Sequence, residues 1–284
     1  MKTAFVGLGV MGYPMAGHLK RAGHEVAVFN RSPGKAQRWA EVFGGGACAT
    51  VAQAAESAEV LALCVGNDDD VRQVVRAALP SLAPGAVIVD HTTTSAKLAR
   101  EMAELAAASG RAFVDAPVSG GQAGAENGQL TIMCGGDAAA FASAEPAMSA
   151  YARAIRLMGG PGAGQLTKMV NQICIAGLLQ GLAEGLHFAR RTGLDPAEVF
   201  LAISKGAAQS WQMDNRWATM SEGRFDFGFA VDWMRKDLGL VLDEASAKGA
   251  TLEVTALVDR YYAEVQDLGG GRWDTSSLVA RLER

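Results

Sequence analysis

The spacing of apolar residues changes partway along this 284-residue chain. In the first half, short apolar runs such as KTAFVGLG, HEVAVFN and GAVIVDHT alternate with segments of helical spacing such as YPMAGHLKRAG and SAKLAREMAELAAASG. Strands that are apolar on both faces, separated by amphipathic helices, predict a parallel sheet covered by helices. The runs LTIMCGG and AIRLMGG are expected to close the same sheet.

The pattern becomes purely helical after about residue 162. Helical periods are expected over residues 165–192, 196–204, 230–248 and 252–267. Asp195 can cap the second of these helices, and Pro196 suits its first position. We therefore predict an α/β domain over residues 1–162 and an all-α domain over residues 163–284, joined by a long helix.

Composition and charge exclude several classes of protein. With 49% hydrophobic and 20% charged residues the chain can build a core, and it does not resemble a disordered protein. A net charge of -4 with scattered basic residues gives no indication of nucleic-acid binding. No apolar run approaches the roughly 20 residues that span a bilayer. The N-terminal apolar run is cut by glycines, so we do not interpret it as a signal peptide.

The cysteines give no sign of a metal site, because they lie far apart and lack the spacing of metal ligands. They are Cys48, Cys64, Cys134 and Cys174. Most lie in apolar runs, where a reduced thiol behaves as a small hydrophobe. A cytoplasmic protein without a metal is expected.

Gly7, Gly9 and Gly12 form the pattern G-x-G-x-x-G between the first strand and the first helix. In this context the pattern is typical of the Rossmann dinucleotide-binding fold, in which the pyrophosphate meets the helix N-terminus. Val10 and Met11 lie inside this loop and are expected to contact the cofactor. The alternative is a glycine-rich structural turn.

The end of the second strand indicates which dinucleotide is bound. NAD-selective enzymes usually place Asp or Glu here, whereas this chain has Asn30, Arg31 and Ser32, with Lys35 one turn later. An arginine fork suits the 2′-phosphate, so NADP(H) is expected in preference to NAD(H). The alternative is that Arg31 is only a solvated turn residue.

Two later strand ends should also meet the cofactor, because ligands bind beyond the carboxyl ends of parallel strands. The expected contacts are Val65, Gly66, Asn67 and Thr93. The acidic run that follows, residues 68–70, is expected mainly to cap a helix.

Ser119, Gly120 and Gly121 follow another strand and can offer a hydroxyl and successive backbone N–H groups to a substrate carboxylate. Composition alone favours a plain glycine turn. On the long helix, Lys168, Asn171 and Gln172 share one face. A lysine at the domain edge could extend to water, but beside a nicotinamide Lys168 is a candidate general acid.

Six segments together resemble the β-hydroxyacid dehydrogenase family. They are FVGLGVMGYPMAGHL, FNRS, DHTTTS, DAPVSGG, GAGQLTKMVNQ and KDLGLVLDEA. The resemblance covers almost the whole chain and implies a Rossmann domain followed by an all-α domain that forms homodimers or homotetramers. It implies reduction of a small carboxylate-bearing aldehyde, or oxidation of a 3-hydroxyacid. Glyoxylate and succinic, tartronate and methylmalonate semialdehydes are the candidate substrates.

The same resemblance implies individual roles. Lys168 matches the catalytic lysine, residues 119–121 match the clasp for the substrate carboxylate, and Asn171 matches the first amide of the family's K-x-x-N-N motif. Gln172 replaces the second asparagine. Lys236 matches a lysine that approaches the cofactor, and Trp211 falls where some members place a pocket aromatic, although a core or interface tryptophan is an equal alternative. The segment FNRS is similar to that of the NADP-preferring branch.

Three other functions are alternatives to this one. The 6-phosphogluconate dehydrogenases have a histidine in the lysine helix, and this chain has none between His91 and His187. Imine reductases share the architecture but usually lack the lysine, so Lys168 disfavours this alternative. It stays open, because lysine-containing members of the family can also take imines. A cofactor-binding scaffold without activity is the third alternative.

Overall fold

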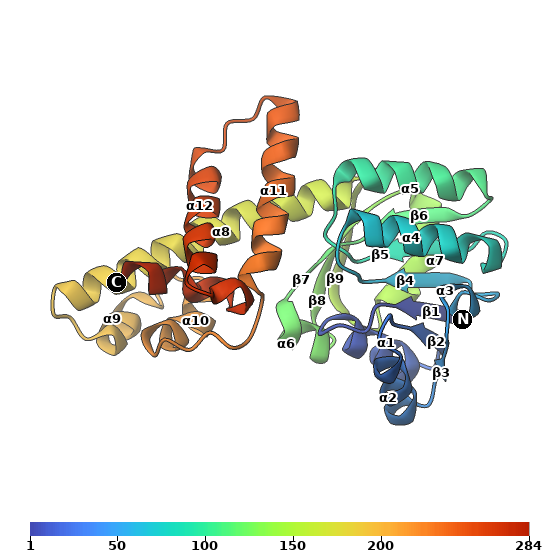
Figure 1. Cartoon of the computed structure of the whole chain (residues 1–284), viewed down its shortest axis with the longest axis horizontal. Coiled ribbons are helices and arrows are strands. Elements are labelled where there is room, and N and C mark those ends of the chain that lie inside the picture. The colour runs from blue at the N-terminus through green and yellow to red at the C-terminus, as the bar shows by residue number, and fades with distance from the viewer. Residues whose placement is uncertain (284) are drawn as a thin grey trace. The chain divides into compact units, whose positions relative to one another are not determined.

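The structure, a computed structural model, describes residues 1–283 of the chain. The chain divides into two compact units, Met1–Lys168 (unit 1) and Met169–Arg284 (unit 2). Helix α8 (Ala163–Arg191) carries the chain from unit 1 into unit 2 (Figure 1). Of the helices in residues 1–283, none has both the length and the apolar character that a bilayer crossing requires.

Unit 1 alternates strands and helices, as the sequence pattern predicted. Its strands are β1 (Lys2–Val6), β2 (Glu25–Phe29), β3 (Gly46–Ala47), β4 (Val60–Leu63), β5 (Val87–Asp90), β6 (Ala112–Asp115), β7 (Val118–Ser119), β8 (Leu130–Gly135) and β9 (Ala152–Gly159). Its helices before α8 are α1 (Gly12–Arg21), α2 (Pro33–Phe43), α3 (Val51–Ala54), α4 (Asp68–Ala78), η1 (Leu79–Ser81), α5 (Ala96–Ala108), α6 (Gly121–Glu126) and α7 (Ala138–Met148).

Within the described residues these strands form one nine-stranded sheet. Its order is β3-β2-β1-β4-β5-β6-β8-β7, with β9 paired to β8. On β1, Val6 is in register with Phe29 of β2 and with Leu63 of β4, so the carboxyl ends of these three parallel strands lie at one edge. This confirms the predicted α/β fold, and in such sheets ligands bind beyond that edge.

The prediction of a parallel sheet was wrong for its last part. The closing strands predicted from LTIMCGG and AIRLMGG do join the sheet as β8 and β9, but β8 runs antiparallel to β6 and β7. β7 follows β6 closely, and only residues 120–129, with the short helix α6, connect it to β8. So short a connection can reverse the chain but cannot return it to the start of a parallel neighbour.

Helices cover both faces of the sheet, and β1 shows how the sequence achieves this. Successive side chains of a strand point to opposite faces. Phe5 is buried with Met15 of α1, whereas its neighbours Ala4 and Val6 are buried with Leu98 of α5. Figure 1 shows α1 and α2 on one side of the strands and α4 and α5 on the other.

The beginning of α8 is fixed to unit 1 by buried polar contacts. Asp115, at the end of β6, accepts hydrogen bonds from the backbone N–H groups of Gly162 (2.8 Å) and Gln165 (2.9 Å). The Gln165 side chain accepts from the N–H of Thr94 (3.0 Å) and donates to the carbonyl of Thr92 (2.7 Å). A carboxylate therefore caps the helix, and an amide attaches its first turn to the loop after β5.

Gly164 is needed for this close attachment. A Cβ atom at this position would lie 2.4 Å from the carbonyl oxygen of Met133 and 2.6 Å from that of Asp115. Any side chain would push α8 away from the strands β6 and β8, so the helix begins where it does because residue 164 has no side chain.

Beneath this helix start lies a layer of buried titratable groups. Burial raises the pKa of Asp90 to about 7, and raises that of Asp115 to about 6 against the opposing hydrogen bonds from Gly162 and Gln165. His91 contacts the carbonyl of Ala116 (2.7 Å) and the Tyr151 hydroxyl (2.8 Å), and burial lowers its pKa to about 4. The layer is thus held in its uncharged forms more readily than the same groups in water.

The described part of unit 2 consists of helices and their connections, with one isolated antiparallel bridge between Ala230 and Asp274. After α8 it contains α9 (Pro196–Ile203), α10 (Trp211–Ser221), α11 (Val231–Lys248), α12 (Glu253–Asp267), η2 (Gly270–Arg272) and η3 (Thr275–Leu282). Helices α8, α9, α11 and α12 confirm the four predicted periods. Helix α10 was not predicted, although its buried Met213, Trp217 and Met220 have helical spacing and Ser210 caps it. These residues pack in one cluster with Tyr262.

We predict that Asp90→Asn changes the pH dependence of stability. The folded protein keeps a proton on Asp90 up to a pKa of about 7, whereas the unfolded chain releases it near the ordinary aspartate pKa of 3.8. This group therefore lowers the free energy of unfolding as pH rises between those values. The free energy of unfolding of the variant minus that of the wild type should therefore rise by about 4 kcal/mol between pH 4 and pH 8.

Urea unfolding of both proteins across this pH range measures the difference. His91 has the opposite dependence, but it is present in both proteins and cancels. The exposed Asp226→Asn is the control, and its difference from the wild type should stay nearly constant with pH. A difference for Asp90→Asn that is equally flat would contradict the prediction.

Candidate active site

The three glycines after β1 have the separate roles that a dinucleotide fingerprint requires. Gly7 has φ +95°, and a Cβ there would lie 2.2 Å from the carbonyl oxygen of Cys64. A Cβ on Gly12 would lie 1.9 Å from the carbonyl oxygen of Gly7, so α1 packs against the strand end. Gly9, by contrast, has nothing within 4 Å of its Cβ position. Its backbone is open to an incoming group, as close approach of a pyrophosphate requires.

The residues between these glycines begin α1 without a side-chain cap. Val10 is exposed, and Met11 occupies the N-cap position but has no oxygen to accept from the first N–H groups of the helix. A helix N-terminus left in this way favours an anion, through its N–H groups and its dipole. The loop of residues 7–12 is therefore suited to hold a dinucleotide pyrophosphate.

The turn after β2 holds the residues predicted to select the cofactor. The side chain of Asn30 accepts a hydrogen bond from the N–H of Leu8 (2.9 Å) and donates one to the carbonyl of Ser32 (3.2 Å). Asn30 therefore connects this turn to the fingerprint loop. The side chain of Arg31 is 83% exposed, and Lys35 and Ser32 are exposed as well. The two cations lie at the end of β2, where the adenosine ribose binds in Rossmann folds.

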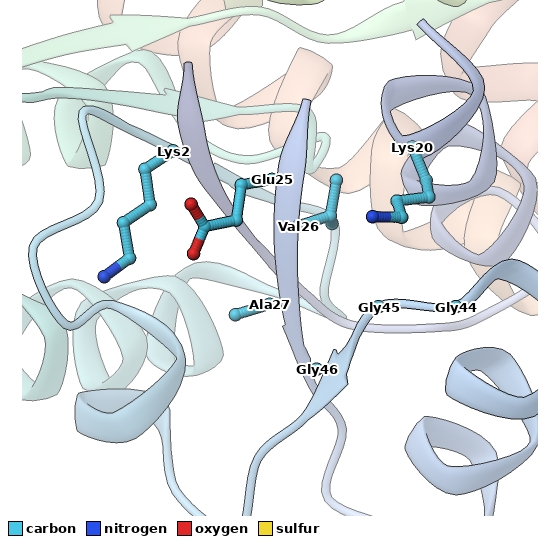
Figure 2. A pocket seen from close by; sticks show the side chains of 8 residues that line it. All are labelled: Lys2, Lys20, Glu25, Val26, Ala27, Gly44, Gly45 and Gly46. Carbon is cyan, nitrogen blue, oxygen red and sulfur yellow. The ribbon is translucent and has the colours of Figure 1, made fainter. Parts of the chain in front are cut away.

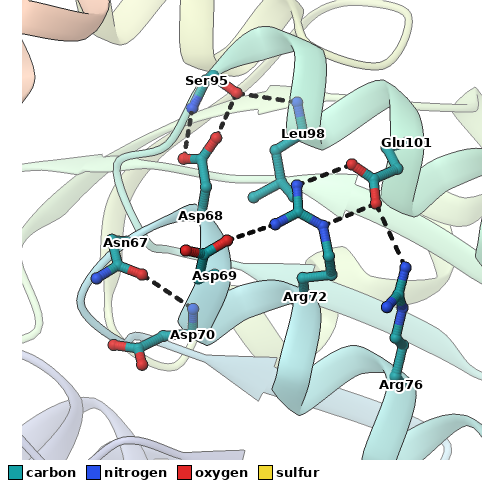
Figure 3. Close-up of polar contacts among 9 residues, drawn as sticks. All are labelled: Asn67, Asp68, Asp69, Asp70, Arg72, Arg76, Ser95, Leu98 and Glu101. Carbon is teal, nitrogen blue, oxygen red and sulfur yellow. Dashed lines mark hydrogen bonds and ion pairs between the residues drawn. The ribbon is translucent and has the colours of Figure 1, made fainter.

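The loops after β4 and β5 are bonded to each other. The N–H of Val65 donates to the Thr92 hydroxyl (3.0 Å), next to Thr93. Asp68 accepts from both the N–H (3.0 Å) and the hydroxyl (2.5 Å) of Ser95, as Figure 3 shows. These contacts fix the two loops in one arrangement at the carboxyl edge of the sheet.

The helix cap in this region is not the one we expected. Asn67 caps α4, because its side chain accepts from the N–H of Asp70 (2.9 Å). The three aspartates instead fill the first helical turn, where their charges favour the helix dipole. Gly66 donates to the Asp70 carboxylate (3.2 Å).

The Ser119 turn is built around two glycines in conformations that other residues rarely adopt. Ser119 lies on β7 in register with Thr131, and it is followed by Gly120 with φ +131° and Gly121 with φ +60°. Nothing lies within 4 Å of the Cβ position of Gly121. The turn thus exposes backbone next to a hydroxyl, as a clasp for a carboxylate requires.

Lys168 lies one helical turn after Gln165 on α8, and it is only 7% exposed. The contacts of Asp115 and Gln165 therefore hold it at the same edge of the sheet as the fingerprint loop and the Ser119 turn. A lysine simply extending to water from the domain edge would be far more exposed.

Asn171 and Gln172 begin a chain of hydrogen bonds inside unit 2. The Asn171 amide donates to Gln172 (2.8 Å), and the Gln172 amide donates to the buried carboxylate of Asp237 (2.7 Å). Lys236 forms an ion pair with the other oxygen of Asp237 (3.2 Å). Gln172 is 2% exposed, so the longer glutamine arm reaches a buried partner.

Trp211, the residue predicted as a pocket aromatic, belongs to a different helix of unit 2, α10. Trp211 is exposed at the start of α10, with the guanidinium of Arg216 5.1 Å from its ring centroid. The ammonium of Lys236 lies 5.8 Å from the ring of Trp233.

Sequence reasoning missed several residues that organise the site. Asp115 and Gln165 were not singled out, although Asp115 stands at the end of a buried strand, where a carboxylate has a structural or functional reason to be. Asp70 was named only as part of a helix-capping run, without its contact to Arg31. Among residues 1–283 no group of His, Cys, Asp and Glu could hold a metal ion.

Two surface hollows lie away from these loops. One is lined by Lys2, Lys20, Glu25 and the glycines after α2, at the amino ends of β1 and β2 (Figure 2). Since the fingerprint follows the carboxyl end of β1, this hollow lies at the opposite edge of the sheet. The other hollow belongs to unit 2 and is lined mainly by the C-terminal part of α8, including Gly181, Gly185 and Phe188.

Comparison with known proteins agrees with this arrangement. Residues 2–160 match the family model for the NAD binding domain of 6-phosphogluconate dehydrogenase. Residues 162–282 match the family model for the NAD-binding of NADP-dependent 3-hydroxyisobutyrate dehydrogenase. Together these matches indicate a nicotinamide cofactor.

Individual relatives match along the whole chain. An uncharacterized oxidoreductase of Shewanella frigidimarina is 60% identical over 100% of this chain and 98% of its own length. The 2-hydroxy-3-oxopropionate reductase of Escherichia coli is 34% identical over 100% and 97%. The structure of Mycobacterium tuberculosis 3-hydroxyisobutyrate dehydrogenase with L-serine superimposes with a TM-score of 0.91 at 30% identity, over 100% of this chain and 99% of that one.

The matches to both domains and to full-length dehydrogenases point to a dehydrogenase or reductase acting on hydroxyacids. The chain belongs to the β-hydroxyacid dehydrogenase family.

Proposed function

We propose that this protein is an NADP(H)-dependent reductase of small aldehyde acids that also runs in reverse as a 3-hydroxyacid dehydrogenase. The observation that carries the proposal is the burial of Lys168 one turn after the capped start of α8, at the sheet edge that holds the fingerprint loop. The names of the relatives from Escherichia coli and Mycobacterium tuberculosis support the substrate class.

The cofactor would be held by the carboxyl edge of the sheet. Residues 7–12 would take the pyrophosphate on the start of α1, and Arg31 and Lys35 would take the 2′-phosphate of NADP. The loops after β4 and β5, including residues 65–67 and Thr93, would line the rest of the site. Bound NADPH supplies the hydride. The description of the second family model supports NADP as the preferred form.

The chain's own residues then handle the substrate and the proton. Ser119 and the backbone of the two following glycines would hold the substrate carboxylate. The ammonium of Lys168 would polarise the aldehyde carbonyl and donate a proton to its oxygen as the carbon receives the hydride and becomes a primary alcohol. Lysine would afterwards recover its proton from solvent. Burial strengthens such an interaction, because little water competes for the oxygen.

In this proposal the amides of α8 support the lysine. Asn171 follows Lys168 by one turn on the same helical face and would contact the lysine or the substrate oxygen. Gln172 would hold Asn171 in place, since its own amide spans from Asn171 to Asp237. Roles for Lys236 at the cofactor and for Trp211 at the substrate stay predictions from the family pattern. A reducing cytoplasm suits the free thiols of the described residues.

Lys168→Met tests the proposed general acid. The variant keeps the length of the side chain but loses the proton, so kcat for reduction should fall by about 10²–10⁴ while NADPH binding persists. The assay is NADPH oxidation with glyoxylate, a panel of semialdehydes and a cyclic imine. Lys20→Met, at the opposite edge of the sheet (Figure 2), is the control and should retain wild-type turnover.

Undiminished reduction of every aldehyde acid by Lys168→Met would rule out this mechanism. Turnover of the imine alone by the wild type would assign the protein to imine reduction. Tight NADPH binding without any turnover would favour a cofactor-binding scaffold.

Ser119→Ala tests the carboxylate clasp. Loss of a hydrogen bond to a charged group should raise KM for the aldehyde acid about tenfold or more. The matched control is the methyl ester of the same aldehyde, whose KM should hardly change. An equal effect of the variant on acid and ester would show that Ser119 does not recognise the carboxylate.

We also propose that the protein self-associates through one face of α8. Val170, Leu178 and Phe188 are exposed on this face, and Gly181 and Gly185 lie between them with nothing within 4 Å of their Cβ positions. Exposed apolar side chains beside small residues let another helix approach closely. A second copy of the chain, as a homodimer or as part of a homotetramer, is the proposed occupant.

The Phe188→Glu variant should therefore have a lower molar mass than the wild-type assembly, as measured by light scattering after size-exclusion chromatography. The replacement would bury an unpaired charge in the proposed interface, which is costly. Val42→Glu, an exposed apolar position on α2, is the control and should leave the mass unchanged. A wild type that is monomeric at micromolar concentration would contradict the proposal.

A further inference from the structure

A carboxylate stands beside the arginine that is proposed to bind the 2′-phosphate. The guanidinium of Arg31 lies 3.2 Å from one carboxylate oxygen of Asp70, a residue on the first turn of α4. The two residues are far apart in sequence, and only the pairing of β2, β1 and β4 brings their loops together. No sequence pattern indicated this contact.

Asp70 is the fixed member of the pair. Its other carboxylate oxygen accepts from the N–H of Gly66 (3.2 Å), and its own N–H donates to Asn67. A Cβ on Gly66 would lie 2.6 Å from that same oxygen, so the carboxylate can rest against the loop because residue 66 is glycine. The Asp70 side chain is 18% exposed and that of Arg31 is 83% exposed. The guanidinium is therefore the partner that can move.

The position of this carboxylate matters for the choice of cofactor. In Rossmann folds an acidic side chain near the end of β2 accepts from the ribose hydroxyl of NAD and opposes the 2′-phosphate of NADP. Here the residue at that place is Asn30, whose side-chain oxygen already accepts from Leu8. Asp70 brings a carboxylate to the same turn from the neighbouring loop.

We propose that Asp70 is a specificity-determining residue that restrains the preference for NADP and lets the enzyme use NADH as well. This inference rests on the proposed function, because it assigns the 2′-phosphate to Arg31. With NADPH, the Arg31 guanidinium turns from Asp70 to the 2′-phosphate. The negative charge of the Asp70 carboxylate repels this phosphate and so weakens NADPH binding. With NADH, the Asp70 carboxylate accepts a hydrogen bond from a ribose hydroxyl, and Arg31 stays paired with the carboxylate.

Asp70→Asn tests the inference by equilibrium binding. An asparagine oxygen can still accept from Gly66, so the loop keeps its contact while the charge is lost. The ratio of the Kd for NADH to the Kd for NADPH, measured by cofactor fluorescence, should rise about tenfold. Arg31→Gln is the second variant, on an exposed residue, and should lower the ratio by a similar factor.

Asp69→Asn is the matched control. Asp69 is the preceding residue on the same helical turn, it loses the same charge, and its side chain is 82% exposed and paired with Arg72 rather than Arg31 (Figure 3). Its ratio should stay within about twofold of the wild type, because exposed charges of this kind interact weakly.

An unchanged or lower ratio of the Kd for NADH to the Kd for NADPH in Asp70→Asn would overturn the inference. An equal rise of this ratio in Asp69→Asn would also overturn it, because it would reveal a general effect of charge. Failure of the wild type to bind either dinucleotide would instead refute the proposed function. The two failures are distinguishable, because one concerns a ratio and the other concerns binding itself.

Discussion

The hydrogen bonds between Asp115 and the first backbone N–H groups of α8 determine where Lys168, the proposed general acid, lies. Asp115 belongs to the end of β6, and α8 begins far later in the sequence, after β9. By accepting from Gly162 and Gln165 it satisfies groups that a helix start leaves without partners. Gln165 then bonds the loop after β5. Because the first turn of α8 is anchored in this way, Lys168, one turn later, is held at the carboxyl edge of the sheet.

This anchoring has an electrostatic cost, which the surrounding groups reduce. Asp90 and Asp115 are in register on adjacent parallel strands and both are buried. Burial raises the pKa of each, to about 7 for Asp90 and about 6 for Asp115. The backbone N–H groups of Gly162 and Gln165 favour the charged form of Asp115, whereas Oδ2 of Asp90 has no hydrogen-bond partner among residues 1–283. Asp115 is therefore the better placed of the two to hold a negative charge at the helix start.

Much of this architecture could be predicted from sequence, because it depends on local patterns. Apolar runs identified the longer strands but not the two-residue β3, and they did not separate β7 from β6. Helical periods identified α8, α9, α11 and α12, and G-x-G-x-x-G located the loop whose glycines differ as expected in φ and in free space. The reversed direction of β8 was missed, because strand direction depends on how the short segment 120–129 turns. Helix α10 was missed because its apolar face is short.

The contacts that organise the site were less predictable, since they join residues distant in sequence. Asp115 and Gln165 are separated by 50 positions, and Arg31 and Asp70 by 39. Nothing in the local sequence of any of them specifies its partner. The same holds for Gln172: in the sequence it was a departure from a familiar motif, and only its contact with the buried Asp237 explains the longer side chain.

The most direct test of the account is a crystal structure of the protein with NADPH and a non-reducible carboxylate analogue of the aldehyde acid. The account predicts that the Lys168 ammonium lies within about 3 Å of the analogue's carbonyl-equivalent oxygen, with the analogue's carboxylate on the Ser119 turn and α8 still capped by Asp115. An analogue bound with its carboxylate elsewhere, or with another side chain on that oxygen and Lys168 directed away from it, would contradict the account.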